Sequence, residues 1–175
     1  MLLNPPGRST GARTRNAVSR AARVLGYDHV TITNLCAVPT RSVVELNNLG
    51  HDAWELARGD LEAGLSSTDA ILAGWGIAGV AGEARRSLCA QVAWLQEVAL
   101  AKGIESFWMI GGEPRHPSRW HQYVADKYQR TSGGSFEERI RQVLVAVPIR
   151  ESLGAPPVGL GPAVGLQRSM STAPN

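Results

Sequence analysis

The sequence predicts an α/β protein in which helices cover a central, mostly parallel sheet. Apolar or β-branched runs at 1–3, 29–35, 70–75 and 106–110 alternate with stretches of helical periodicity. Strands that alternate with helices in this way pair in parallel through right-handed crossovers. The 175 residues, 43% hydrophobic and 19% charged, suffice for one domain with a sizeable core. We therefore expect a single domain over 1–150.

Each expected strand has its own signal. The run at 1–3 stops at a loop, Asn4-Pro5-Pro6-Gly7, so the chain starts on the last residues of a strand. Residues 29–35 carry β-branched side chains, and residues 70–75 are apolar throughout, as in a strand buried on both faces. The run at 106–110 leads directly into Gly111-Gly112.

Helical periodicity predicts helices near 13–25, 43–46, 54–65, 83–102 and 120–124. Ser135 and Glu138 have the spacing of a capping box, which predicts one more helix. Its expected buried face consists of Phe136, Ile140, Val143, Leu144 and Val147. Pro, Gly, Ser and Ala dominate the C-terminal end, so we expect a disordered tail over 151–175.

Composition excludes several classes of protein. Cys36 and Cys89 lack the spacing of a zinc or iron–sulfur site, and phosphate-loop, H-E-x-x-H and G-x-S-x-G patterns do not occur. The sequence therefore predicts no metal and no cofactor. With no apolar run near the ~20 residues of a membrane span, we expect a cytoplasmic protein. The net charge of +3 is compatible with a polyanionic partner or with a simple solubilising role.

The stretch Pro114-Arg115-His116-Pro117-Ser118, which we call the ledge, has the composition of a rigid loop. Each proline fixes its own φ angle and favours extended geometry in the residue before it. The sequence alone allows two readings, a surface turn with an idle histidine or a loop that presents an imidazole to a ligand.

The predicted topology decides between these readings. Ligands of parallel α/β sheets bind at the carboxyl ends of the strands. Asn4, Asn34, Trp75-Gly76 and His116 follow the four expected strands, so we predict that they converge on one site.

Residues 1–120 resemble a family of bacterial and phage proteins known only as a domain of unknown function. The matching signals are Leu3-Asn4-Pro5, Gly26-Tyr27, Thr33-Asn34-Leu35, Trp75-Gly76 and Pro114-Arg115-His116-Pro117. The order of motifs is also similar to the uracil-DNA glycosylase superfamily, in particular its mismatch-specific branch. This resemblance implies a three-layer α/β/α sandwich around a mostly parallel four-stranded sheet, and a protein that excises or recognises uracil or a modified base in DNA.

The resemblance also implies roles. Asn4, with Pro5, orients the attacking water, and His116, followed by Ser118, donates to the departing base, which fits a monofunctional N-glycosidic hydrolase of DNA repair. Asn34 reads the base, and Trp75-Gly76 ends the strand beside it. The flipped nucleotide would be held by stacking on Trp75 or Trp120 and by phosphate contacts. Candidates for the DNA backbone are Arg8, Arg13, Arg15, Arg115 and Arg119.

Two departures from the glycosylase pattern keep alternatives open. Arg115 indicates a phosphate or a base other than uracil, and Arg119-Trp120-His121 replaces an apolar wedge. The first alternative is a non-catalytic nucleic-acid-binding module with the same fold. The second is an enzyme acting on a free nucleoside or nucleotide, whose phosphate is held by Arg115 and Gly111-Gly112.

Overall fold

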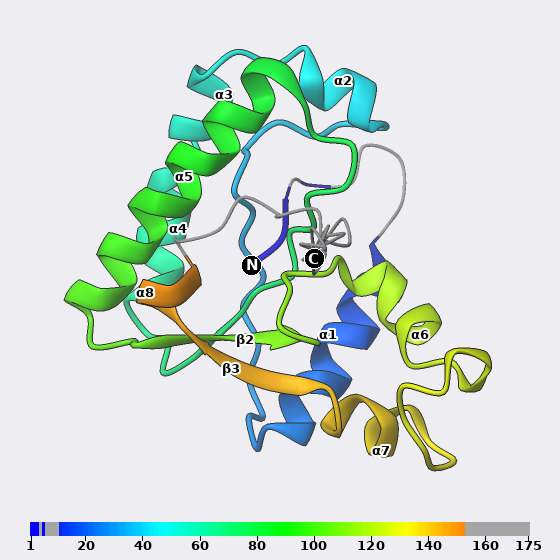
Figure 1. Cartoon of the computed structure of the whole chain (residues 1–175). Helices are drawn as coiled ribbons and strands as arrows, with labels where there is room; N and C mark the ends of the chain where they lie inside the picture. The colour runs from blue at the N-terminus through cyan, green and yellow to red at the C-terminus, as the bar shows by residue number, and fades with distance from the viewer. Residues whose placement is uncertain (4, 6–10, 153–175) are drawn as a thin grey trace, which may run out of the picture.

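The chain folds as a mixed α/β protein around a small three-stranded sheet (Figure 1). The structure is a computed structural model that describes residues 1–3, 5 and 11–152. The sheet has the order β1-β2-β3, with β1 at Ile71–Leu72, β2 at Ser106–Ile110 and β3 at Leu144–Pro148. β1 pairs with β2 in parallel, and β3 pairs with β2 antiparallel. The predicted mixture of helices and strands is thus confirmed, with three assigned strands in a sheet that has one parallel and one antiparallel pair. The predicted tail lies outside the described residues from 153 onward.

The predicted helices are present, with small shifts at their ends except for the last one, which is shorter than predicted. The single helix expected at 54–65 is divided into α3 and α4. The helices are α1 (Ala12–Val24), α2 (Val43–Asn47), α3 (Asp52–Glu55), α4 (Arg58–Leu65), α5 (Gly82–Ala101), α6 (Trp120–Tyr123), α7 (Phe136–Arg141) and α8 (Ile149–Ser152). Two 3₁₀ turns, η1 (Pro117–Arg119) and η2 (Asp126–Tyr128), flank α6.

The sheet divides the core into two hydrophobic clusters. Phe107 and Met109 of β2 belong to the cluster that contains buried residues of α2, α3, α4 and α5. Ile110 belongs to the other cluster, which contains buried residues of α1, α6 and α7, and Trp108 packs against it. Alternate side chains of a strand point to opposite faces, so β2 buries apolar side chains on both.

The strand β3 corrects the prediction that residues 143–147 continue the last helix. α7 does begin with the predicted capping box between Ser135 and Glu138, but it ends at Arg141. Leu144 and Val147 then lie opposite Ile110 and Phe107 on β2. When residues 144–148 pair with the edge of β2 that β1 leaves free, their backbone N–H and C=O groups gain hydrogen-bond partners. The β-branched side chains of this segment also favour a strand. The i, i+4 spacing of the apolar residues is also compatible with a helix, which explains the error.

The expected strands at 1–3 and 29–35 are reduced to a single parallel bridge between Leu2 and Asn34. The Leu2 N–H donates to the Thr33 oxygen, and the Leu35 N–H donates to the Leu2 oxygen, both at 2.8 Å. On the other side, the Gly74 N–H donates to the Met1 oxygen at 2.9 Å. Residues 1–3 therefore lie between residues 33–36 and the chain that continues from β1.

Residues 28–32 make no backbone hydrogen bond within the described part of the chain. A cavity of about 440 Å³ separates this segment from residues 69–72. The β-branched composition at 29–35 therefore predicts a longer strand than the structure contains, because strand assignment requires a paired neighbour. Likewise, only Ile71 and Leu72 of the expected strand at 70–75 are assigned as strand.

Candidate functional site

A pocket of about 870 Å³ lies at the carboxyl ends of β1 and β2. The ledge forms one part of its lining, and Trp75-Gly76 forms another. Leu3 and residues 40–43, which precede and open α2, complete the lining on the far side. Segments from four distant parts of the sequence thus meet at the edge of the sheet where α/β proteins bind their ligands.

The ledge and Trp75-Gly76 pack directly on each other. The Gly76 N–H donates a hydrogen bond of 2.5 Å to the Pro114 oxygen. Gly76 has a φ of +64°, and a Cβ placed there would lie 3.3 Å from the His116 Cβ. A Cβ at Gly74 would lie 3.2 Å from Pro117 Cδ. The close approach of the two backbones explains the glycines at both positions.

Two tryptophans support the ledge from the core. Trp120 is fully buried, and its indole Nε1 donates to the Arg115 oxygen at 2.6 Å. Trp75 is only 4% exposed, and its ring meets Phe107 edge to face with the centroids 5.9 Å apart. The predicted stacking of a base on Trp120 is therefore not available in this conformation. Trp75 lines the pocket but presents little of its ring.

The protonation of His116 follows from its contacts. The Ser118 backbone N–H donates to His116 Nδ1 at 3.3 Å, and the Ser118 Oγ lies 2.9 Å from the same nitrogen. Since Nδ1 accepts, the proton of the neutral imidazole is on Nε2. Burial and, secondarily, the charge of Arg119 lower the pKa of His116 below its ordinary value. His116 is therefore a neutral hydrogen-bond donor through Nε2 near pH 7.

One wall of the pocket is cationic and aromatic. Arg115 stacks on the Tyr123 ring, with Cζ 4.3 Å from the ring centroid, and forms a 2.9 Å ion pair with Glu113. Arg130 lies 4.6 Å from the centroids of both Tyr123 and Tyr128. Glu113 is the only acidic side chain in the lining described by the structure. The wall therefore carries an excess of positive charge.

Arg119 belongs to the same wall. Its Nη1 donates to Gln122 Oε1 at 3.3 Å, and Gln122 in turn contacts the hydroxyl of Tyr128 at 3.5 Å. The rest of the lining is mixed: Val43 and Ile77 are partly open to solvent at 39% and 41%, and Arg41 adds another cation. A ligand in the pocket thus meets both apolar side chains and positive charge, which suits an aromatic ring that carries an anion.

The structure brings some of the predicted site residues together. Trp75, Gly76, Arg115, His116, Ser118 and Arg119 all line the pocket. Asn4 and Arg8 lie outside the described residues. Pro5 is half-buried and does not line the described pocket, although Leu3, two residues before it, does.

Asn34 is placed beside this group rather than within it. It is not among the described lining residues, and its bridge partner is Leu2. Its side-chain Oδ1 is buried and has no hydrogen-bond partner within the described part of the chain. A buried acceptor without a partner is costly, which makes Asn34 a candidate to receive a hydrogen bond from a ligand.

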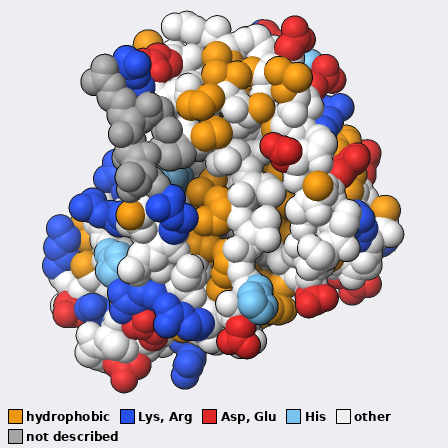
Figure 2. Space-filling view, turned by 180° about the vertical axis from the view of Figure 1, so that it is seen from behind, with side chains coloured by type: hydrophobic (Ala, Val, Ile, Leu, Met, Phe, Trp, Pro, Cys, Tyr) orange, Lys and Arg blue, Asp and Glu red, His pale blue; other side chains and the backbone are white. Residues whose placement is uncertain are grey.

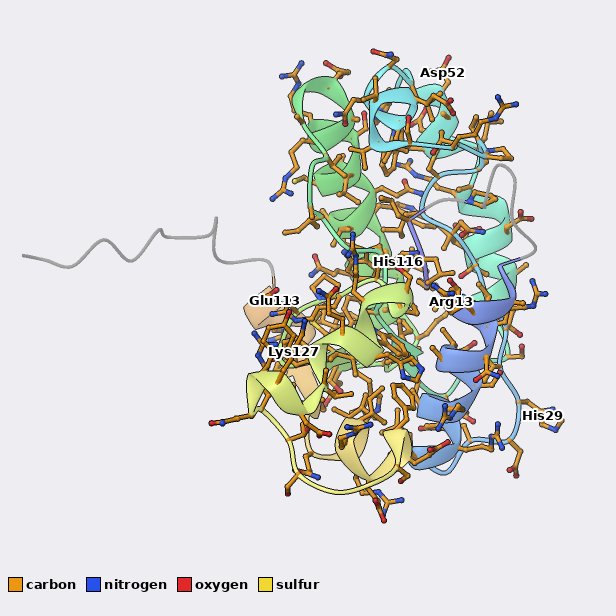
Figure 3. The ribbon with its side chains drawn as sticks, turned by 90° about the vertical axis from the view of Figure 1, so that its right-hand side faces the viewer. Arg13, His29, Asp52, Glu113, His116 and Lys127 are labelled. Atoms are coloured by element: carbon orange, nitrogen blue, oxygen red, sulfur yellow. The ribbon has the colours of Figure 1, made fainter. Side chains whose placement is uncertain are left out.

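The remaining predicted backbone contacts, Arg13 and Arg15, are exposed on α1 and do not line the described pocket. α1 packs against η1, which carries Arg119. Figure 3 shows Arg13 at the start of α1, with His116 above it in this view, whereas His29 projects from a distant edge. In Figure 2, Lys and Arg side chains gather on the side of the molecule formed by α1, α6 and α7.

Sequence reasoning missed the aromatic part of the cationic wall. Tyr123, Tyr128 and Arg130 come from a short segment without a recognised motif. The available signal was the concentration of Tyr, Lys and Arg between 123 and 130. In the described residues no group of three or more potential metal ligands occurs, and no helix is long and apolar enough to cross a membrane.

Comparison of the chain with protein-family models, curated proteins and solved structures finds no match. The function of the pocket is therefore argued from its own geometry.

Proposed function

We propose that this protein recognises a nucleobase in DNA, uracil or a modified base, and excises it by hydrolysis of the N-glycosidic bond. The observation that carries the proposal is the neutral His116 in a pocket with a cationic wall. Its Nδ1 is occupied by Ser118, so Nε2–H is the group available to a ligand.

Glycosidic cleavage leaves negative charge on the departing base and positive charge on the sugar. A preorganised donor stabilises the base anion without the cost of reorienting water. A neutral imidazole serves this purpose because it donates a hydrogen bond without first having to lose or gain a proton. In the proposed mechanism Asn4 orients the attacking water and Asn34 accepts a hydrogen bond from the base.

The backbone pairing supports a glycosylase-like sheet. Asn34 is bridged to Leu2, and residues 1–3 are hydrogen-bonded in turn to the chain from β1, which pairs with β2. The Met1 oxygen accepts from Gly74, and the Met1 amino group donates to the Leu72 oxygen at 2.7 Å. These contacts have the pattern of a parallel ladder. We propose that the four segments form the parallel sheet of the sandwich, with β3 added antiparallel at one edge.

DNA is the proposed partner because Arg115, Arg119 and Arg130 line the pocket, and because Lys and Arg side chains gather on the side of the molecule formed by α1, α6 and α7 (Figure 2). Contacts of arginine with phosphate release counterions, so the affinity for DNA should fall steeply as salt increases.

The test is a glycosylase assay on oligonucleotides that carry uracil, mismatched thymine or hypermodified pyrimidines. We expect the wild-type protein to release one class of base. The rate of release should fall at least about 100-fold in His116→Ala, because the loss of one hydrogen-bond donor to a transition state has an effect of that size. Arg86→Ala, which removes a cation from α5 away from the pocket, is the matched control. Turnover that survives both Asn4→Ala and His116→Ala would contradict the mechanism.

A second candidate is a protein that binds a free nucleotide. It is favoured by the position of Arg115 and Arg130, which both line the pocket and both contact the ring of Tyr123. Nucleotides that raise the melting temperature, in the absence of DNA binding, would support this candidate over the first. Salt-dependent DNA binding without excision would instead identify a non-catalytic binding module.

A further inference from the structure

Two arginines contact the ring of the same side chain, Tyr123. The guanidinium of Arg115 stacks at 4.3 Å and that of Arg130 at 4.6 Å from the centroid of the same ring. Arg130 Nη1 also donates to the Tyr123 oxygen at 3.2 Å. The Tyr123 hydroxyl lies next to Gly111, where an added Cβ would be only 2.1 Å from it. Both cations thus contact an aromatic side chain that is itself packed against the backbone.

The hydrogen-bonding capacity of Arg115 is only partly used. Nη2 forms the ion pair with Glu113, whereas Nε is buried and has no hydrogen-bond partner among the residues that the structure describes. The Glu113 side chain is 63% exposed and that of Arg115 is 32% exposed. The carboxylate is thus the more exposed member of the pair. Exposed ion pairs contribute little to stability, so another anion can replace the carboxylate at small cost.

We propose that Arg115, Tyr123 and Arg130 form a phosphate-binding subsite, and that Glu113 occupies it as an internal anion until a phosphate group displaces it. A guanidinium binds phosphate through paired N–H groups, and the second guanidinium on the same ring adds positive charge to the subsite. The ligand class is a phosphate ester, supplied by a free nucleotide or by a nucleic-acid backbone.

This subsite deepens the proposed function, but its test does not depend on base excision. A phosphate held at Arg115 would place the attached sugar and base close to His116, since the two residues are adjacent on the rigid ledge. Glu113 would then tune affinity, because every ligand phosphate competes with the carboxylate for the same guanidinium.

The experiment compares Glu113→Gln and Arg115→Met with the wild-type protein by isothermal titration. The probes are inorganic phosphate, thymidine 5′-monophosphate and a single-stranded oligonucleotide that carries an abasic site. Glu83→Gln and Arg86→Met are matched controls, because these residues form an exposed ion pair on α5 away from the pocket. Thermal melts confirm that each variant is folded.

We expect Glu113→Gln to bind phosphate about 3- to 10-fold more tightly than Glu83→Gln does, since removal of a competing surface ion pair has a small effect. Arg115→Met should bind phosphate at least about 10-fold more weakly than Arg86→Met does, because it loses a charge-assisted hydrogen bond to the ligand. The nucleotide and the abasic oligonucleotide distinguish the two sources of phosphate. Equal affinities of Glu113→Gln and Glu83→Gln, or of Arg115→Met and Arg86→Met, would overturn the proposal.

His116→Ala separates this proposal from the proposed function. Phosphate affinity within about twofold of the wild type, with base excision lost, would support both proposals. The opposite result is that His116→Ala abolishes excision while Arg115→Met leaves the phosphate affinity unchanged. This result would overturn the phosphate subsite but leave the proposed function intact.

Discussion

At the scale of single residues, the chemistry of His116 is set by its neighbours. Ser118 fixes the tautomer, and burial together with Arg119 lowers the pKa. The unfolded chain then binds more protons than the folded protein at pH values between the lowered pKa and the ordinary value of about 6.5. Stability is therefore lost as the pH falls through that interval.

The variant His116→Gln should flatten this dependence, because it removes the group that must be protonated. We expect a smaller loss of unfolding free energy between pH 7 and pH 5 than in the wild type, measured by urea denaturation. Some dependence should remain, since burial also lowers the pKa of His121. His29→Gln, at an exposed position, is the control. Identical slopes in His116→Gln and the wild type would contradict the assignment.

Gly111 and Gly112 offer a matched pair of substitutions. Both have positive φ angles, +60° and +74°, but only a Cβ at Gly111 would collide with the Tyr123 hydroxyl. Gly112→Ala should cost about 1 kcal/mol from backbone strain alone. Gly111→Ala should cost on the order of 1–3 kcal/mol more, because Tyr123 must move. Denaturation of the two variants measures the difference, and equal losses would show that Tyr123 adapts freely.

At the scale of elements, the helices, their caps and the strand β2 follow from the sequence, whereas β3 and the short extent of the other strands do not. The capping box of Ser135 and Glu138 predicts the start of α7 because it depends on local hydrogen bonds. The end of α7 and the start of β3 depend instead on the free edge of β2, which the local sequence does not describe. Residues 28–32 are a second example. Their composition favours a strand, but within the described part of the chain their backbone has no neighbouring strand to pair with.

The cap itself is testable. The Ser135 Oγ accepts from the Glu138 N–H at 3.1 Å, so Ser135→Ala should lower the unfolding free energy by about 1 kcal/mol. Ser132→Ala is the control, because Ser132 contributes backbone rather than side-chain hydrogen bonds to the same loop. A loss no larger than that of the control would indicate that the cap is not formed in solution.

α1 and α7 are joined by an ion pair between Arg20 and Glu137. The hydrogen bond from Arg20 lowers the pKa of Glu137 to about 2. The pair stabilises the protein above the ordinary carboxyl pKa, and this stabilisation is lost as the pH falls towards 2. Solvent screens the pair, since Glu137 is 39% exposed, so Glu137→Gln should cost about 0.2–1 kcal/mol at pH 7.

Denaturation curves between pH 2 and pH 7 measure this effect. The difference between the variant and the wild type should shrink below pH 4. A difference that is constant over the whole range would show that packing, rather than charge, accounts for it.

At the scale of the whole molecule, the sequence predicted that motifs from separate strands would meet. The ledge and Trp75-Gly76 do so, joined by a hydrogen bond between Gly76 and Pro114. The prediction was possible because topology places the carboxyl ends of parallel strands at one edge. The stacking of Arg115 and Arg130 on Tyr123 was not predictable, since it depends on how the chain returns from η2 to the pocket.

The central claim is that a nucleobase contacts His116 in this pocket. The most direct measurement is a titration of ¹⁵N-histidine-labelled protein with an oligonucleotide that carries the excised or recognised base, compared with the same oligonucleotide lacking that base. We expect the His116 Nε2 resonance to shift only with the intact base, while Nδ1 remains an acceptor. A His116 signal that is unchanged by both oligonucleotides, or shifted equally by both, would contradict it.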